Sequence, residues 1–191
     1  MIVRALDRGE LAARIDDLAA LRIVVFRDWP YLYDGDLEYE RRYLRPYLDS
    51  DGAVVAGALD GGRLVGAATG APLSDHAADF AAAFAGTGLA LSDIYYCAES
   101  VLLPEYRGMG IGHRFFDIRE RKARDLGCRH VAFCAVQRPD DHPMRPARPR
   151  PLDAFWRGRG YAPLPGVLAE FSWRDIGHEA ETRKPLQFWI R

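Results

Sequence analysis

The 191-residue sequence has little lysine, few cysteines and no long apolar run. Lysine occurs only at Lys122 and Lys184, so arginine carries nearly all the positive charge, and abundant alanine accompanies it, as in proteins from GC-rich genomes. The net charge is -1, so no global electric field attracts nucleic acid or an anionic membrane surface. We therefore expect neither a nucleic-acid partner nor a membrane partner.

The three cysteines, Cys97, Cys128 and Cys134, have neither the number nor the spacing of a disulfide framework or a zinc site. The histidines are scattered without metal-ligand spacing, so we expect no metal. The N-terminus lacks the apolar core of a signal peptide, and no apolar run approaches the length of a membrane span. These absences predict a soluble, cytoplasmic protein with reduced thiols.

What is present is an alternation of strand-like and helix-like segments, without an internal repeat or a linker. Helical spacing predicts helices from Asp7 to before Pro30, from Asp36 with a kink at Pro46, and over residues 74–85, 110–126 and 152–157. Strand-like segments span residues 2–5, 53–59, 64–69, 94–103, 130–136, 168–173 and 186–190, with a hairpin turn at 60–62 and a proline-rich loop at 138–151. This order predicts a single α/β or α+β domain over residues 1–191.

One segment carries a chemical signal, because a strand runs into a glycine-rich turn that opens a helix. The turn is Arg107-Gly108-Met109-Gly110-Ile111-Gly112. The first N–H groups of a helix have no internal partners and lie at the positive end of the helix dipole, which makes an anion site. The three glycines let the backbone approach a bulky phosphate, and the arginine adds a permanent cation.

Two other phosphate-binding loops do not fit this turn. A Walker loop ends in Gly-Lys-Ser or Gly-Lys-Thr, whereas this turn continues Gly112-His113. The dinucleotide fingerprint has a different glycine spacing and follows an early strand. The remaining alternative is a helix N-terminus that merely turns tightly, and three glycines at alternate positions after an arginine argue against it.

The segment resembles the acetyl-CoA signature of the GNAT acyltransferase superfamily, Gln/Arg-x-x-Gly-x-Gly/Ala. Arg107, Gly110 and Gly112 match it position by position. The resemblance implies a GNAT-like α/β domain with a mixed, mostly antiparallel sheet of six to seven strands and helices on both faces. It implies acetyl-CoA as co-substrate, with the CoA pyrophosphate on the backbone amides of this loop. It also implies that pantetheine lies beside residues 101–103, where the strand 94–103 splays from 130–136.

Amine acetylation needs a route for a proton, because holding an ammonium group neutral at pH 7 costs roughly 4–5 kcal/mol. Glu99 is the candidate general base, since it is an acidic residue within an apolar strand. The resemblance supports this role, because related acetyltransferases often use a carboxylate on this strand. The alternatives are an ion pair with one of the arginines or simple exposure at an edge. An N–H group of Val101, Leu102 or Leu103 is the expected donor to the oxyanion.

The general acid of related proteins is missing here. They commonly use a tyrosine, in a helix resembling Phe-Tyr-x-x-x-Gly-Phe, to protonate the departing thiolate, and Trp156 takes that position. An indole is no acid at neutral pH, but a thiol with a pKa of ~8.5 leaves a tolerable thiolate. Tyr96, Tyr161 and His142 are alternative acids, although each is better explained as structural. Cys134 is better explained by packing than by a covalent acetyl-cysteine route.

The segment between the first two predicted helices holds Trp29, Tyr31 and Tyr33. In the superfamily this loop walls the acceptor pocket, so the resemblance assigns these residues to substrate binding. Aromatic faces with Asp34 and Asp36 nearby suit a cationic amine. The alternative is an aromatic plug that packs the loop.

Three functions fit these observations. The first is an N-acetyltransferase that moves an acetyl group from acetyl-CoA to a primary amine of a small molecule, by direct attack in a ternary complex. The second is acetylation of a protein N-terminus or lysine. The third is a CoA-binding sensor or interaction module without turnover, which the tryptophan at position 156 supports. A homodimer is one oligomeric state that we consider.

Overall fold

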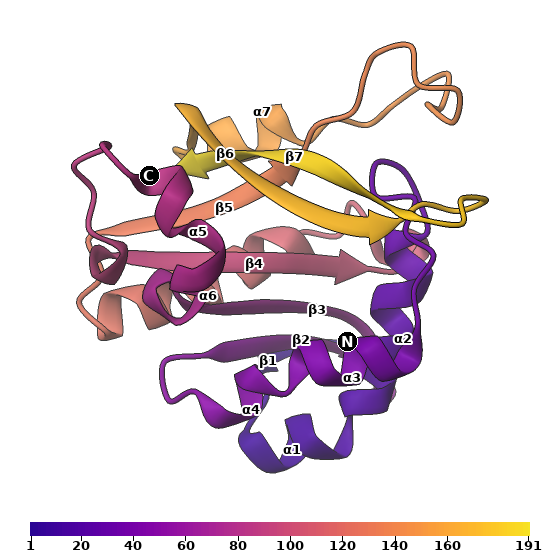
Figure 1. Ribbon diagram of the computed structural model, residues 1–191. Coiled ribbons are helices and arrows are strands. Elements are labelled where there is room, and N and C mark those ends of the chain that lie inside the picture. The colour runs from indigo at the N-terminus through magenta and orange to yellow at the C-terminus, as the bar shows by residue number, and fades with distance from the viewer.

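Seven strands form one continuous sheet in the computed structural model, which describes residues 1–191 (Figure 1). The sheet order is β1-β2-β3-β4-β5-β7-β6. The strands are β1 (Ile2–Ala5), β2 (Val54–Asp60), β3 (Arg63–Pro72), β4 (Ile94–Leu102), β5 (His130–Val136), β6 (Ala162–Arg174) and β7 (Glu181–Ile190). The β4–β5 pair is parallel and the other neighbouring pairs are antiparallel. This confirms the mixed, mostly antiparallel sheet that the sequence predicts.

The first helices begin where their capping residues predict. α1 (Arg8–Ala13) follows Asp7, which forms a reciprocal capping box with Glu10. α3 (Leu37–Leu44) follows Asp36, whose carboxylate accepts a hydrogen bond from a first-turn N–H. At the predicted kink the helix is divided in two, because α4 (Pro46–Asp49) starts at the proline, although Arg45 between the two helices keeps helical dihedrals. The helix predicted from Asp7 is also divided, since Arg14 leaves helical geometry (φ -114°, ψ 12°) before α2 (Ile15–Phe26).

Later in the chain, the helix predicted over residues 74–85 begins as a 3₁₀ turn, η1 (Leu73–His76), and continues as α5 (Ala77–Phe84). Tight 3₁₀ turns are common at helix starts. The remaining elements are η2 (Leu91–Asp93), η3 (Pro104–Tyr106), α6 (Ile111–Asp125) and α7 (Asp153–Gly158). None of the helices combines the length and the apolar character needed to cross a membrane.

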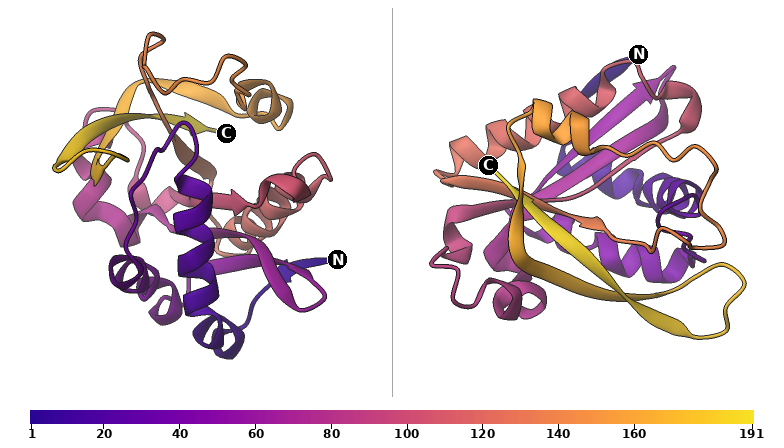
Figure 2. Two further views of the ribbon diagram at one scale, coloured as in Figure 1. Left: turned by 90° about the vertical axis from the view of Figure 1, so that its right-hand side faces the viewer. Right: turned by 90° about the horizontal axis from the view of Figure 1, so that it is seen from above.

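Helices cover both faces of the sheet, as predicted. Successive β4 side chains point to opposite faces. Tyr95 and Cys97 pack with Phe116 of α6, whereas Tyr96 packs with Phe80 of α5. Figure 2 shows α6 and α7 on one side of the sheet and the helices from α2 to α5 on the other. The second side holds the cavity described below.

The two C-terminal strands are longer than the sequence predicts. β6 begins at Ala162 rather than at residue 168, and β7 begins at Glu181 rather than at residue 186. Because proline usually marks the end of a strand, the presence of Pro163 and Pro185 argued against strand structure in these N-terminal extensions. β6 is an edge strand, where proline is tolerated, and its register with β7 shifts between Pro163 and Leu168.

Candidate active site

The glycine loop leaves six consecutive backbone N–H groups available. Gly108 and Gly110 adopt positive φ angles of 82° and 77°, and Gly110 caps α6. None of the N–H groups of residues 108–113 donates a hydrogen bond to another protein atom. A Cβ added at either position would meet no atom within 4 Å, so the loop is open on its outer side. This geometry can bind an anion such as a phosphate.

The side chains of this loop contribute unequally. Arg107 is exposed, and its Nε donates to the Leu102 carbonyl at 3.3 Å. Its Nη1 lies 3.8 Å from the carboxylate of Asp28, a pair too exposed to fix the guanidinium group. Met109 projects into solvent, whereas Ile111 is buried in the core. Arg107 is therefore the loop's free cation, and Ile111 can offer a ligand only its backbone.

The sheet opens beside this loop, because β4 and β5 part after a short parallel pairing. Residues 94–96 pair with residues 130–132, after which β5 continues its pairing only with β7. The rest of β4, residues 97–102, therefore has an edge without a strand partner. The expected splay between the two strands is confirmed.

Within the run 101–103, one N–H group faces that open edge. The Leu103 N–H donates to the Val65 carbonyl of β3 at 3.0 Å. In an antiparallel ladder, residues alternate between facing the partner strand and facing away from it. Val101 is therefore turned toward β3 like Leu103, and Leu102 is turned away, consistent with the bond that its carbonyl accepts from Arg107.

A β-bulge decides where Glu99 points. Thr69 of β3 pairs with Glu99, but Ala71 pairs with Tyr96, so β4 holds one extra residue between them. The extra residue resets the alternation and brings Tyr96 and Glu99 to the same cavity. Arg119 of α6, only 1% exposed, donates to the carbonyl oxygens of Thr69 and Glu99 at 3.3 and 2.9 Å. It thereby satisfies polar groups at the bulge.

Sequence reasoning missed Arg119, although a signal for it exists. It lies in a strongly charged stretch of α6, which suggests an exposed helix face. Its spacing of four residues from Phe115 and from Ala123, however, places it on the apolar stripe of the helix. A charged residue on such a stripe is expected to be buried and to require hydrogen-bond partners in the core.

The cavity on this face of the sheet has a volume of about 160 Å³. It lies between α2, α3, α5 and the strands from β4 to β7, and half of its lining residues are aromatic. The lining comprises Arg22, Phe26, Tyr31, Tyr33, Tyr39, Glu40, Tyr43, His76, Asp79, Phe80, Tyr96, Ala98, Glu99, Cys134, Phe171, Ser172, Trp173 and Leu186. Three of the predicted site residues are thus brought together here, namely Glu99, Tyr31 and Tyr33.

Trp29 is not among them, because its ring packs edge-on against His142 with centroids 5.3 Å apart. Tyr31 is held at the cavity by the loop that follows β5. This loop is the proline-rich one predicted over residues 138–151, and its first residue, Arg138, is mostly buried and donates to the carbonyls of Pro30 and Tyr31 at 2.8 and 2.6 Å. Its guanidinium also forms a bidentate pair with Asp175, at 2.8 and 2.9 Å.

Glu99 lies in a buried ion cluster. Its Oε2 pairs with Arg22 of α2, which pairs in turn with Glu40 of α3. Tyr43 donates its hydroxyl to the same Glu99 oxygen at 3.3 Å. Burial lowers the pKa of Arg22, but the Glu99 and Glu40 carboxylates and Tyr43 together raise it by more, so the guanidinium stays charged. The ion pair considered from sequence is therefore present, and it occurs at the cavity wall.

The acidic residues near the aromatic segment have other roles than the sequence suggested. Asp34 pairs with Arg174 at 2.9 Å, and Asp36 caps α3. Neither lines the cavity. The carboxylates that line the cavity are instead those of Glu40, Glu99 and Asp79. Of these, only Glu99 was identified as a candidate from the sequence.

The alternative acids are now placed. Tyr96 lines the cavity, with its hydroxyl 3.1 Å from the Cys134 Sγ. Burial raises the pKa of Tyr96 and raises that of Cys134 to about 12, so both stay protonated at neutral pH. Tyr161 donates to Glu120 at 2.9 Å within the cluster on the α6 side of the sheet, away from the cavity.

Trp156 also lies on the α6 side of the sheet. Its ring packs against Phe133 and Trp189, with centroids 4.9 and 5.1 Å apart. The position that resembles the family's tyrosine is thus a packing position here.

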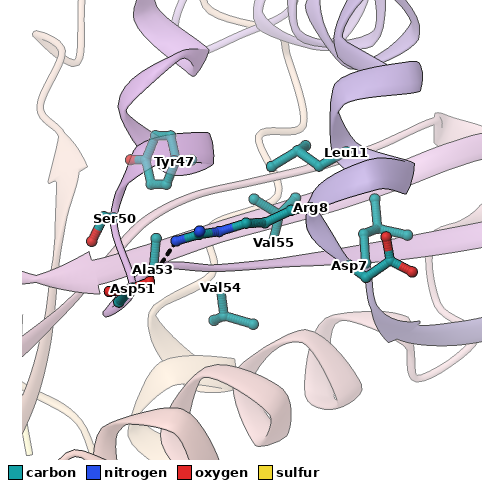
Figure 3. Close-up of a pocket in the computed structure, with 10 residues that line it drawn as sticks. Asp7, Arg8, Leu11, Tyr47, Ser50, Asp51, Ala53, Val54 and Val55 are labelled. Atoms are coloured by element: carbon teal, nitrogen blue, oxygen red, sulfur yellow. Dashed lines mark hydrogen bonds and ion pairs between the residues drawn. The ribbon is translucent and has the colours of Figure 1, made fainter.

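A second cavity, of about 150 Å³, lies between α1, α4 and β2 (Figure 3). Arg8 crosses it and pairs with Asp51 at 2.6 Å. It shares no residue with the predicted site.

Comparison with known proteins agrees with this geometry. Residues 19–147 match the acetyltransferase (GNAT) family, while a search among curated proteins finds no match. Among solved structures, the ribosomal-protein-alanine N-acetyltransferase from Brucella melitensis aligns with a TM-score of 0.62 and 17% identity, covering 100% of this chain and 99% of the other. An aminoglycoside 6'-N-acetyltransferase complexed with coenzyme A aligns with a TM-score of 0.63 and 15% identity, covering 100% and 96%.

The aminoglycoside 6'-N-acetyltransferase from Enterococcus faecium aligns over the same shares, 100% and 96%, with a TM-score of 0.60 and 15% identity. At these identities the alignments establish a common fold. The family match covers most of the chain, and it includes the glycine loop, the splayed strands and Glu99. The chain belongs to the acetyltransferase (GNAT) family.

Proposed function

We propose that this enzyme transfers an acetyl group from acetyl-CoA to the primary amine of a small molecule, by direct attack in a ternary complex. One observation carries the proposal. A loop of unpartnered amides and a splayed strand edge adjoin a small, acidic, aromatic cavity along a single strand, β4. The free thiols fit a cytoplasmic location.

The residues that would hold CoA fit its chemistry. The amides of residues 108–113 suit the pyrophosphate, and Arg107 adds a cation at the edge of the loop. The unpaired edge of β4 at residues 101–103 suits the amide groups of pantetheine, because strand-like pairing satisfies them. When bound, acetyl-CoA supplies the acetyl group as a thioester.

The chain's own residues then support attack by the amine. Glu99 Oε1 has no hydrogen-bond partner and can accept the proton of the ammonium group. The Leu102 N–H faces the open edge and can stabilise negative charge that develops on the thioester oxygen. The thiol has a pKa of ~8.5, so its thiolate can depart without the tyrosine that Trp156 replaces.

A small-molecule acceptor is favoured by the small volume of the cavity, about 160 Å³. A protein terminus or lysine needs an open groove along which a peptide can lie, whereas this cavity is bounded by helices and strands on several sides. A module that binds CoA without turnover is the remaining alternative, supported by the packed Trp156. Measuring thiol release distinguishes this module from an enzyme, because a module without turnover releases no thiol from acetyl-CoA.

The test is thiol release from acetyl-CoA with a panel of amines, followed by a pH–rate series on Glu99→Gln. We expect the variant to bind CoA normally but to turn over about 10²–10⁴-fold more slowly. The deficit should shrink at high pH, where more of the amine is already neutral. Glu170→Gln, on the exposed outer strand β6, is the control and should match the wild type. Wild-type rates for Glu99→Gln from pH 6 to 9 would remove Glu99 from the proton step.

A further inference from the structure

The ion cluster at the cavity wall carries more negative than positive charge. One guanidinium, Arg22, is shared by two carboxylates, Glu40 and Glu99. All three are buried, with exposed fractions of 6%, 0% and 9%. The cluster therefore holds an excess of one negative charge away from solvent, which is costly unless a cation completes it.

Each carboxylate also has an oxygen left over. The Oε2 atoms of Glu40 and Glu99 contact Arg22, while the Oε1 atoms of both are buried without a hydrogen-bond partner. Burial and the interaction of its hydroxyl with Glu40 raise the pKa of Tyr33, but the Oε1 atom of Glu40 accepts no hydrogen bond. Two buried acceptors without donors indicate a ligand that donates hydrogen bonds.

The rest of the lining supplies no competing cation. Besides Arg22, the only basic residue is His76, and burial lowers its pKa, which favours the neutral ring. The third carboxylate, Asp79, is exposed at the α5 side, where solvent screens it. A charged group entering the cavity is therefore selected by the Arg22 cluster.

Aromatic rings complete the cavity and limit its size. Nine of the lining residues are Phe, Tyr or Trp, whose faces attract an ammonium group and pack against an apolar body. The volume is about 160 Å³. A protein cavity of about 150 Å³ holds a single benzene ring. One ring-sized body fills the space, and a molecule with several rings would extend through the open side of the cavity into solvent.

We propose that the acceptor is a compact monoamine, with one ammonium group on one ring-sized apolar body, and that Glu40 is the residue that selects its charge. This inference rests on the proposed function, and it assigns the acceptor class of the same site. Glu99 takes the proton in the reaction, whereas Glu40 contributes to recognition because it supplies the second negative charge at Arg22 and an oxygen, Oε1, without a hydrogen-bond partner.

The test compares four probes with the full chain: 2-phenylethylamine, 2-phenylethanol as its neutral analogue, 1,4-diaminobutane as an amine without a ring, and a three-ring aminoglycoside. Binding is measured by calorimetry without acetyl-CoA, and thiol release is measured separately. We expect 2-phenylethylamine to bind at least about tenfold tighter than each of the others. An alcohol that binds within about twofold of the amine, or tighter binding of the diamine or the aminoglycoside, would overturn the inference.

Two variants test which carboxylate produces the preference for amine over alcohol. Glu40→Gln should lower the preference for amine over alcohol at least about tenfold and raise KM, with kcat within about threefold of wild type. Asp79→Asn removes the same charge from the exposed side and should keep the preference. Unchanged preference in a folded Glu40→Gln variant would overturn the role of Glu40. If a thermal melt shows that this variant is unfolded, the wild-type amine–alcohol comparison decides.

The two proposals fail in different ways. Selective binding of 2-phenylethylamine without thiol release from any amine would retain the monoamine site and refute the acetyltransfer. Thiol release with another amine class, without selective binding of 2-phenylethylamine, would retain acetyltransfer and refute the monoamine site.

Discussion

Gly110→Ala tests the phosphate-binding role proposed for the glycine loop separately from the loop's contribution to folding. Gly110 has a φ of 77°, and a Cβ there would meet no protein atom within 4 Å. The folded state therefore pays only for left-handed backbone geometry, about 1–2 kcal/mol. For a protein of this size, that lowers Tm by roughly 2–4 °C per kcal/mol. If the loop amides hold a phosphate, the new methyl group lies where the phosphate must approach.

Gly127→Ala is the matched control at the other end of the same helix. Gly127 follows α6 with a φ of 75°, and its added Cβ would also meet nothing within 4 Å. The two variants should therefore lose similar stability in thermal melts. In calorimetry with CoA, we expect Gly110→Ala to lose at least about tenfold in affinity, equivalent to about 1.4 kcal/mol, and Gly127→Ala to lose none. Equal CoA affinity in the two folded variants would refute the placement of CoA at the loop.

Three further predictions follow from the cavity and its surroundings. Tyr31→Ala and Tyr33→Ala should change the ranking of amines in thiol-release assays without changing CoA affinity, whereas Trp29→Ala, outside the cavity, should change neither; altered CoA binding with an unaltered ranking would contradict this. Trp156→Phe should keep the shape of the pH–rate profile, because neither ring titrates, and a displaced acidic or basic limb would count against a packing role. Burial raises the pKa of Cys134 to about 12, so its thiol stays protonated well above neutral pH and Cys134→Ala should retain turnover; a loss beyond about tenfold would revive a covalent route.

Structural features that depend only on residues close together in the sequence could be predicted from the sequence. The capping box at Asp7 and Glu10 is confirmed, as is the strand, turn and helix around residues 94–126. Capping and glycine turns involve residues a few positions apart, so their geometry follows from local chemistry. The same locality explains one error, because apolar residues keep their helical spacing at Leu11, Ile15 and Leu18 across the break at Arg14, so the spacing does not show it.

The composition of the cavity was decided by tertiary structure. Glu99 could be singled out from sequence as an acid in an apolar strand, but Arg22, its partner, and Glu40, the second partner of Arg22, lie on helices distant in sequence that the tertiary fold brings to it. The β4 bulge adds to this, since one extra residue turns every later side chain to the other face and cannot be detected from alternation alone. The sequence by itself thus determined the family resemblance and the position of the glycine loop, because both reside in one contiguous segment. The charge and size of the proposed acceptor site were decided only by the fold, because ion pairing and cavity shape depend on which distant surfaces pack together.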